Sequence, residues 1–257
     1  MNDSSRAESV VKSAKRVLEI FEFFATKQGP ATVMEVAREL NYPQSSTSAL
    51  MESMRSLGYL SYDRYSRQFN PTLRIAFLGA WMQDNMHDQG NLLRLMASLQ
   101  ESTDNTVILG LQNDIHVQYI YSLQGGSPLR LFVRPGTLRP LARAALGKML
   151  LSAKPDSEIR SLLIRINADE EPLENRVDLS TLMEDIRLCR EDGYFISQGS
   201  VTQGAGVIAM LLPTTNEHPQ MAIGIGAPLS RLMEHKEETI DCLREAVRPH
   251  FAPKKTA

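Results

Sequence analysis

Apolar residues in the first third of the chain recur at the spacing of an α-helix. From Ser13 to Ala25 they form one predicted stripe at intervals of three and four residues. The members of that stripe are Ala14, Val17, Leu18, Phe21 and Ala25. Lys27-Gln28-Gly29-Pro30 then interrupts the pattern. The sequence therefore predicts a first amphipathic helix that ends before Gly29.

A second, shorter helix is predicted to begin after Thr32. Thr32 stands three residues before Glu35, which is the spacing of a capping box in which each side chain binds the other residue's backbone amide. Apolar residues follow at helical spacing as far as Leu40. Asn41-Tyr42-Pro43 ends this helix, because Asn tolerates a left-handed turn and Pro cannot continue a helix.

A third helix is predicted from about Gln44 to Gly58, followed by a hairpin. Its expected apolar stripe is Leu50, Met54 and Leu57, with Thr47 in line. Two short β-rich runs come next, residues 59–62 and 67–70, around a turn at 63–66. This order of elements predicts a winged helix-turn-helix domain over residues 10–72.

The polar start of the third helix suits the major groove of DNA, where Gln and Ser side chains bind base edges and phosphates. Basic residues at the start of the first helix and in the hairpin suit the phosphate backbone. The candidate DNA-binding residues are Lys12, Lys15, Arg16, Gln44, Ser45, Ser46, Ser48, Arg55, Arg64 and Arg67. The alternative is that these side chains form the solvated outer face of an ordinary three-helix domain.

Residues 73–88 are predicted to form a linker helix. Phe77, Leu78 and Trp81 would be costly to expose on a lone helix, so we expect them to pack against a second subunit. The alternative is that they cover the chain's own core.

Residues 89–252 alternate between β-rich and helical patterns, which predicts an α+β domain on an antiparallel sheet. The expected strands are 106–112, 117–122, 129–133, 194–197, 207–212 and 221–226. The expected helices are 92–101, 142–152, 156–165, 179–191 and a single final one, 230–247. Residues 253–257 are expected to be disordered.

Composition and charge narrow the possible functions. The 257 residues carry a net charge of −2, with a balance of +2 in residues 1–75 and −4 in the rest. Cys189 and Cys242 are too few for a disulfide framework, and neither a signal peptide nor a membrane-spanning run is present, so we expect a cytoplasmic protein without membrane contact.

Five scattered histidines give no zinc-helix spacing, and no catalytic motif is found, which predicts no metal, no cofactor and no enzyme activity.

Several segments together resemble the IclR family of bacterial transcription regulators. In the first third they are residues 17–20, 36–40, 43–47 and 57–60; further on they are Arg139-Pro140-Leu141, residues 145–148, Gly193-Tyr194 and residues 226–228. The chain departs from the family pattern at Gln44, where members usually carry a basic residue, and at Ala49, where Arg is frequent. Ala142-Arg143-Ala144 replaces the usual His-Ala-Thr or His-Ala-Ser.

The resemblance implies a GAF-like effector-binding domain with a pocket at the start of the helix after Pro140. The family's pocket positions fall on Ala145, Leu146, Ser197, Val207, Gly224 and Gly226. The last four replace the acid, cysteine and two serines of members that bind small oxo-acids. We therefore expect an effector larger and more apolar than glyoxylate or pyruvate, for instance an aromatic carboxylic acid. Alternatively, the two glycines allow close backbone approach. Arg143 either binds the carboxylate or is a solvated or interface residue.

These observations predict a ligand-responsive regulator, more often a repressor, of a catabolic operon. Its expected partners are double-stranded DNA with a pseudo-palindromic operator, a small carboxylate and a second copy of the chain, in a homodimer or a dimer of dimers. The alternative is an enzyme or metabolite-binding module whose helical N-terminal domain contacts proteins.

Overall fold

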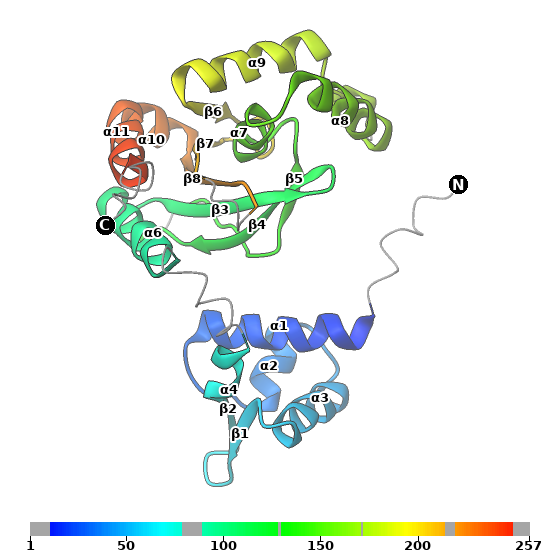
Figure 1. The fold of residues 1–257 in the computed structure, drawn as a ribbon. Coiled ribbons are helices and arrows are strands. Elements are labelled where there is room, and N and C mark those ends of the chain that lie inside the picture. The colour runs from blue at the N-terminus through cyan, green and yellow to red at the C-terminus, as the bar shows by residue number, and fades with distance from the viewer. Residues whose placement is uncertain (1–10, 79–88, 128–129, 171, 214–218, 249–257) are drawn as a thin grey trace, which may run out of the picture. The chain divides into compact units, whose positions relative to one another are not determined.

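The computed structural model describes residues 11–78, 89–127, 130–170, 172–213 and 219–248. The chain divides into two compact units, Met1–His87 and Asp88–Ala257 (Figure 1). Most of the expected linker helix and the C-terminal tail lie outside the described residues, as does Trp81. Within the described ranges, no helix combines the length and the apolarity that crossing a bilayer requires.

The first unit is a helix-turn-helix with a two-stranded wing. Its elements are α1 (Lys12–Lys27), α2 (Val33–Glu39), α3 (Gln44–Ser56), β1 (Leu60–Asp63), β2 (Gln68–Pro71) and α4 (Leu73–Phe77). β1 and β2 pair antiparallel. Ala31 extends this sheet, because its amide and carbonyl both bond the backbone of Phe69, at 2.9 and 2.8 Å. The wing is thereby fixed to the segment between α1 and α2.

The core of this unit has the predicted helical period, but some residues of the two predicted stripes are exposed. On α1 the buried residues are Ile20 and Phe24, whereas Leu18 of the expected stripe is 62% exposed. On α3 the buried residues are Thr47, Met51 and Met54, and Leu57 is exposed. Thr47 and Met54 of the predicted α3 stripe are thus confirmed and Leu50 packs against the core, while Leu57 is wrong and Met51 was not predicted. Three helices packed around one point bury only a narrow face of each, and both helices carry more apolar residues than that face holds.

The caps in the first unit follow the sequence closely. Thr32 Oγ1 accepts from the Glu35 amide at 3.3 Å, and the Thr32 amide donates to Glu35 Oε2 at 2.7 Å, so the capping box is confirmed. Lys27 Nζ lies 2.8 Å from Glu35 Oε1. The hydrogen bond from Lys27, followed by those from Thr32, lowers the pKa of Glu35 to about 2. Gly58 ends α3 with a φ of 79°, a conformation that favours glycine.

The second unit is a six-stranded antiparallel sheet with helices on both faces. Its strands are β3 (Thr106–Asn113), β4 (His116–Leu123), β5 (Leu138–Pro140), β6 (Tyr194–Gln198), β7 (Ala205–Leu211) and β8 (Met221–Pro228). They lie in the order β5-β4-β3-β8-β7-β6. Its helices are α6 (Gln89–Thr103), α7 (Ala145–Ser152), α8 (Asp156–Asp169), the 3₁₀ turn Leu173–Asn175, α9 (Leu179–Asp192), α10 (Leu229–Glu234) and α11 (Lys236–Val247).

Two hydrophobic clusters cover the two faces of this sheet. One joins the sheet to α7, α8 and α9, and the other joins it to α6, α10 and α11 (Figure 1). β8 shows the alternation: Ile223 and Ile225 belong to the second cluster, whereas Gly224 lies against Leu146 of α7. The predicted α+β class with an antiparallel sheet is confirmed.

Two predicted elements of this unit are wrong. A strand was predicted over 129–133. Residues 130–133 form no ladder of backbone hydrogen bonds with another strand, and residues 128–129 lie outside the described part. Side chains bind this backbone instead, since Ser122 Oγ donates to the Val133 carbonyl at 2.8 Å and Thr106 Oγ1 to the Leu131 carbonyl at 2.7 Å. The final helix is divided at His235, whose φ of −108° and ψ of 28° are not helical.

Candidate functional site

The N-terminal end of α3 presents a small polar surface. Gln44, Ser45 and Ser48 are exposed, while Ser46 is half-buried and its hydroxyl donates to the Pro43 carbonyl at 3.0 Å. No side chain caps the first turn of α3. Its leading amides and the positive end of the helix dipole therefore remain open to an anion such as a phosphate.

The same helix carries no net charge. Its ionisable residues are Glu52 and Arg55, and the Arg55 Nε lies 2.9 Å from both carboxylate oxygens of Glu52. This hydrogen bonding lowers the pKa of Glu52, so the carboxylate stays ionised. Arg55, a predicted DNA-binding residue, is therefore engaged by its neighbour one turn earlier. The exposed face of α3 offers hydrogen-bonding groups for base edges and little attraction for phosphate.

Positive charge is gathered in the turn between β1 and β2 instead. Arg64, Tyr65 and Arg67 are all exposed there, and the Tyr65 side chain is completely so. Asp63 Oδ1 accepts from the Tyr65 amide at 2.8 Å, which holds the turn, and Arg67 has a φ of 56°. Sequence reasoning missed Tyr65, although an aromatic residue between two arginines in a predicted turn was a usable signal.

The basic residues at the start of α1 differ in their surroundings. Lys12 and Lys15 are exposed, and Lys15 Nζ lies 3.8 Å from Glu19. Arg16 is half-buried with its guanidinium 4.7 Å from the centre of the Tyr42 ring. A cation in that position stabilises the contact between α1 and the turn before α3. Lys12 and Lys15 are thus better placed than Arg16 to contact a duplex.

A pocket in the second unit lies between the sheet and the start of α7. It encloses about 400 Å³ of space free of protein atoms, part of it open to solvent. Three of the predicted effector-binding residues line it: Ala145, Ser197 and Val207. The other three, Leu146, Gly224 and Gly226, lie outside the lining.

The two glycines bring leucine side chains against the sheet. A Cβ on Gly224 would stand 2.7 Å from Leu146 Cδ1, and one on Gly226 would stand 2.6 Å from Leu131 Cδ2. Both distances are far shorter than van der Waals contact, so a larger residue at either position would displace a leucine. The space that the glycines leave is therefore filled by Leu146 and Leu131 rather than added to the pocket.

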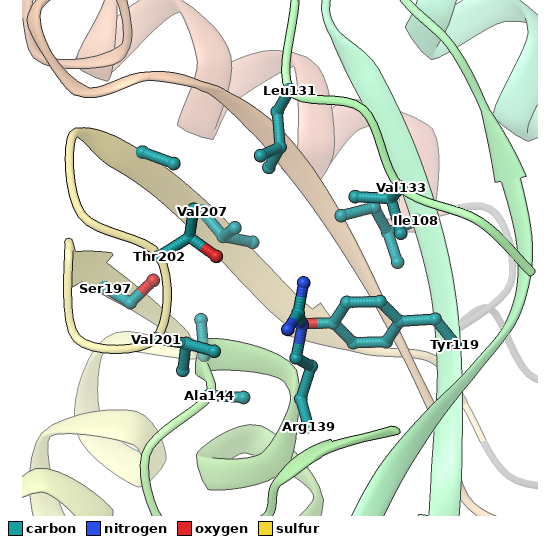
Figure 2. Close-up of a pocket in the computed structure, with 12 residues that line it drawn as sticks. Ile108, Tyr119, Leu131, Val133, Arg139, Ala144, Ser197, Val201, Thr202 and Val207 are labelled. Carbon is teal, nitrogen blue, oxygen red and sulfur yellow. The ribbon is translucent and has the colours of Figure 1, made fainter. Parts of the chain in front are cut away.

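Four polar side chains reach this otherwise apolar pocket: Tyr119, Arg139, Ser197 and Thr202. Figure 2 shows Arg139 and Tyr119 on one side of the space, with Ser197 and Thr202 on the other. Burial raises the pKa of Tyr119 to about 12, against the opposing effect of the Arg139 charge. The phenol is therefore neutral at physiological pH and able to donate. Sequence reasoning did not place either residue in the site: the three residues of the edge strand β5 give no periodic signal for Arg139, and Tyr119 was predicted only as part of a strand.

Arg143 precedes the lining residue Ala144 and is not itself part of the lining. Its guanidinium bonds Glu170 Oε1 at 2.9 Å and the Ser200 carbonyl at 2.7 Å, while Ser200 Oγ donates to the Arg143 carbonyl at 3.0 Å. These bonds join the turn before α7 to the end of α8 and to the segment between β6 and β7. Arg143 already has a carboxylate partner, so a second carboxylate would compete with Glu170.

The described residues hold no cluster of three or more His, Cys, Asp or Glu side chains placed to bind a metal ion. Cys189 is buried on α9, and burial raises the pKa of its thiol to about 12. A thiol with that pKa is a poor nucleophile at neutral pH.

Family models match most of the chain. Residues 13–64 match the IclR helix-turn-helix domain, and residues 87–249 match the bacterial transcriptional regulator IclR C-terminal domain. The HTH-type transcriptional regulator KdgR of Escherichia coli K12 is 23% identical over 92% of this chain and 91% of its own length. The HTH-type transcriptional repressor AllR of the same strain is 24% identical over 90% of this chain and 87% of its own.

Solved structures agree with these matches. The Thermotoga maritima IclR structure has a TM-score of 0.64 at 20% identity and covers 92% of this chain and 96% of its own. An IclR effector domain from Acinetobacter has a TM-score of 0.62 at 27% identity and covers 68% of this chain and 99% of its own. The family consists of regulators, so the prediction of no enzyme is confirmed. This chain belongs to the IclR family of bacterial transcription regulators, and it binds DNA through its first unit and an effector through its second.

Proposed function

We propose that this chain represses a catabolic operon and leaves its operator when a small carboxylic acid occupies the pocket of the second unit. The observation that carries the proposal is the pairing of an open, polar α3 terminus with a basic wing tip on one unit. The relative AllR is named a repressor, which favours repression over activation. We assign residues 10–72 to DNA binding and residues 89–252 to effector binding.

In this proposal, base reading and phosphate binding fall on different elements. Gln44, Ser45 and Ser48 approach base edges in the major groove, where Gln pairs with adenine. Lys12, Lys15, Arg64 and Arg67 bind the phosphate backbone. Ser46, Arg16 and Arg55 have partners within the chain, and we give them a positioning role.

The proposed active form is a homodimer or a dimer of dimers that reads a pseudo-palindromic operator. Support comes from the segment after the wing, where Leu73, Phe77 and Leu78 are between 55% and 76% exposed. Apolar side chains of this size gathered on one short segment are typical of an interface. Two subunits would present two α3 helices to successive turns of one DNA face.

The proposed effector is a carboxylic acid larger and more apolar than glyoxylate or pyruvate, with an aromatic acid as the leading example. The pocket's mostly aliphatic lining supports this choice. Much of the 400 Å³ is open to solvent or too narrow for a water molecule, so a ring-sized ligand must displace flexible side chains such as Leu131. An effector regulates only if it binds one arrangement of the DNA-binding units better than another.

A gel-shift with the full chain and its own upstream DNA tests the proposal, with carboxylic acids added in a second series. We expect specific binding whose affinity falls steeply with salt, since phosphate contacts release counterions, and release by at least one acid. A shift with weak salt dependence would favour a wing that contacts proteins. Binding of an acid without any effect on DNA would remove the proposed regulation.

A further inference from the structure

Arg139 differs from the other cations packed into the second unit. The half-buried residues Arg143, Lys148 and Lys154 each bond a carboxylate, at 2.9, 2.6 and 2.6 Å. Arg139 is half-buried, yet within the described part of the chain no carboxylate lies at ion-pair distance from it. Withdrawing a guanidinium from water without a counter-ion is costly, so the site is better satisfied when an anion is present.

The backbone aims Arg139 inward. It is the middle residue of β5 and pairs with Val117 of β4, whose side chain is fully buried beneath α7. Residues directly opposite in an antiparallel pair share a face of the sheet. The guanidinium therefore enters the pocket from the sheet edge, on the same side of the space as the Tyr119 hydroxyl in Figure 2, and its charge acts on that phenol.

The remaining lining carries no opposing charge. No Asp or Glu is among the twelve residues around the space, and most of the others are aliphatic, including Ile108, Leu131 and Val207. A guanidinium presents two parallel N–H groups that match a carboxylate. The adjacent neutral phenol adds a third donor, and the aliphatic residues exclude water from the rest of the ligand.

We propose that Arg139, assisted by the Tyr119 hydroxyl, is the anion-binding group of the effector pocket, and that the effector is a monocarboxylate with an apolar body. This inference rests on the proposed effector function and names the charge that selects its ligand. It assigns the carboxylate to the β4–β5 edge rather than to the amides at the start of α7 or to Arg143. One cation in an apolar space suits a single negative charge better than a phosphate dianion.

Calorimetry on the full chain tests this with benzoate and phenylacetate, their uncharged amides, and phenyl phosphate. The variants are Arg139→Gln and Tyr119→Phe, with Arg134→Gln as the matched control, because Arg134 is an exposed arginine of the neighbouring segment outside the lining. We expect an acid to bind the native chain and its amide to bind far more weakly. Arg139→Gln should lose roughly tenfold to hundredfold in affinity and Tyr119→Phe about threefold to tenfold, while Arg134→Gln should be unchanged.

Circular dichroism and a gel-shift without ligand check that Arg139→Gln folds. If it does not, Arg139→Lys keeps the charge without the two-pronged geometry and should weaken binding by a smaller factor. Equal binding of acid and amide, unchanged affinity in the Arg139 variants, stronger binding of phenyl phosphate, or no carboxylate binding to the native chain would each overturn the inference. Calorimetry needs no DNA, so the site can be right even if the proposed release from the operator fails.

Discussion

The two units expose their functional side chains in opposite ways. On the first unit, Gln44, Ser45, Arg64 and Tyr65 lie on the outside and contribute little to the core beneath them. In the second unit, the residues that line the pocket lie against the main hydrophobic cluster, where adding or removing one methyl group changes the packing. Substitutions on the first surface should therefore alter affinity alone, whereas those around the pocket should also alter folding.

The largest expected effect is on folding of the second unit. Gly147 lies in α7, and a Cβ there would stand 2.1 Å from the Leu141 carbonyl oxygen, a backbone atom with little freedom to move. Gly147→Ala should lower the free energy of unfolding by roughly 3 kcal/mol or more, measured by urea denaturation. Gly29→Ala, where the nearest atom is 4.0 Å away, is the control. Equal stability of the two variants would contradict the tight packing assigned to α7.

The next effect concerns the wing. Replacing both Arg64 and Arg67 with Ala should weaken operator binding roughly thirtyfold at about 0.15 M salt and reduce the salt slope by about 2, one for each phosphate that an arginine no longer neutralises. Fluorescence anisotropy at several salt concentrations measures both, and the thermal stability should not change. The exposed arginines Arg134 and Arg160 of the second unit, replaced together, serve as control. An unchanged slope would remove the wing from the interface.

A smaller effect separates two neighbours on α3. Thr47 is buried and its hydroxyl donates to the Pro43 carbonyl at 3.1 Å, whereas Ser48 is exposed. Thr47→Val should cost about 1 kcal/mol of stability through the lost hydrogen bond. Ser48→Ala should leave stability unchanged or slightly higher while altering operator affinity. Thermal unfolding measures the stability of each variant, and fluorescence anisotropy measures its operator affinity. If both variants change the same quantity by the same amount, the distinction between Thr47 and Ser48 is wrong.

The smallest effect depends on pH. The pKa of Glu35 is about 2 in the folded chain, below its ordinary 4.5, so the carboxylate stabilises the fold fully above pH 4.5. That contribution fades as pH falls from about 4.5 towards 2. Glu35→Gln should therefore melt below the native chain at pH 6 and approach it at pH 3. Glu39→Gln, at the exposed end of α2, provides the control melting curve, and a difference independent of pH would contradict this account.

Local chemistry explains which elements were predictable. The capping box at Thr32 and the turn at Gly58 depend on a few adjacent residues, so the sequence alone reveals them. Which apolar residues of α1 and α3 are buried depends on the face that meets the other helices, and Leu18 and Leu57 look the same as buried leucines in the sequence. Residues 130–133 have the composition of a strand, but Ser122 and Thr106 bind that backbone from a distance in the sequence.

The candidate site also contains residues that local signals reveal and residues whose place depends on distant segments. The polar start of α3 was found because helix starts and serines are local signals. Arg139 was not found as a site residue, because its position depends on pairing with Val117 across the sheet edge. The glycines at 224 and 226 were expected to enlarge the pocket, yet Leu146 and Leu131 approach from other segments to fill the space.

The pairing of Glu52 with Arg55 has a consequence for how this regulator searches a chromosome. A neutral helix adds little to the residence time on arbitrary DNA, and the carboxylate repels phosphates whenever the helix enters the groove out of register. Encounters with wrong sequences should therefore be brief. The ratio of operator affinity to non-specific affinity should be high for a protein of this overall DNA affinity.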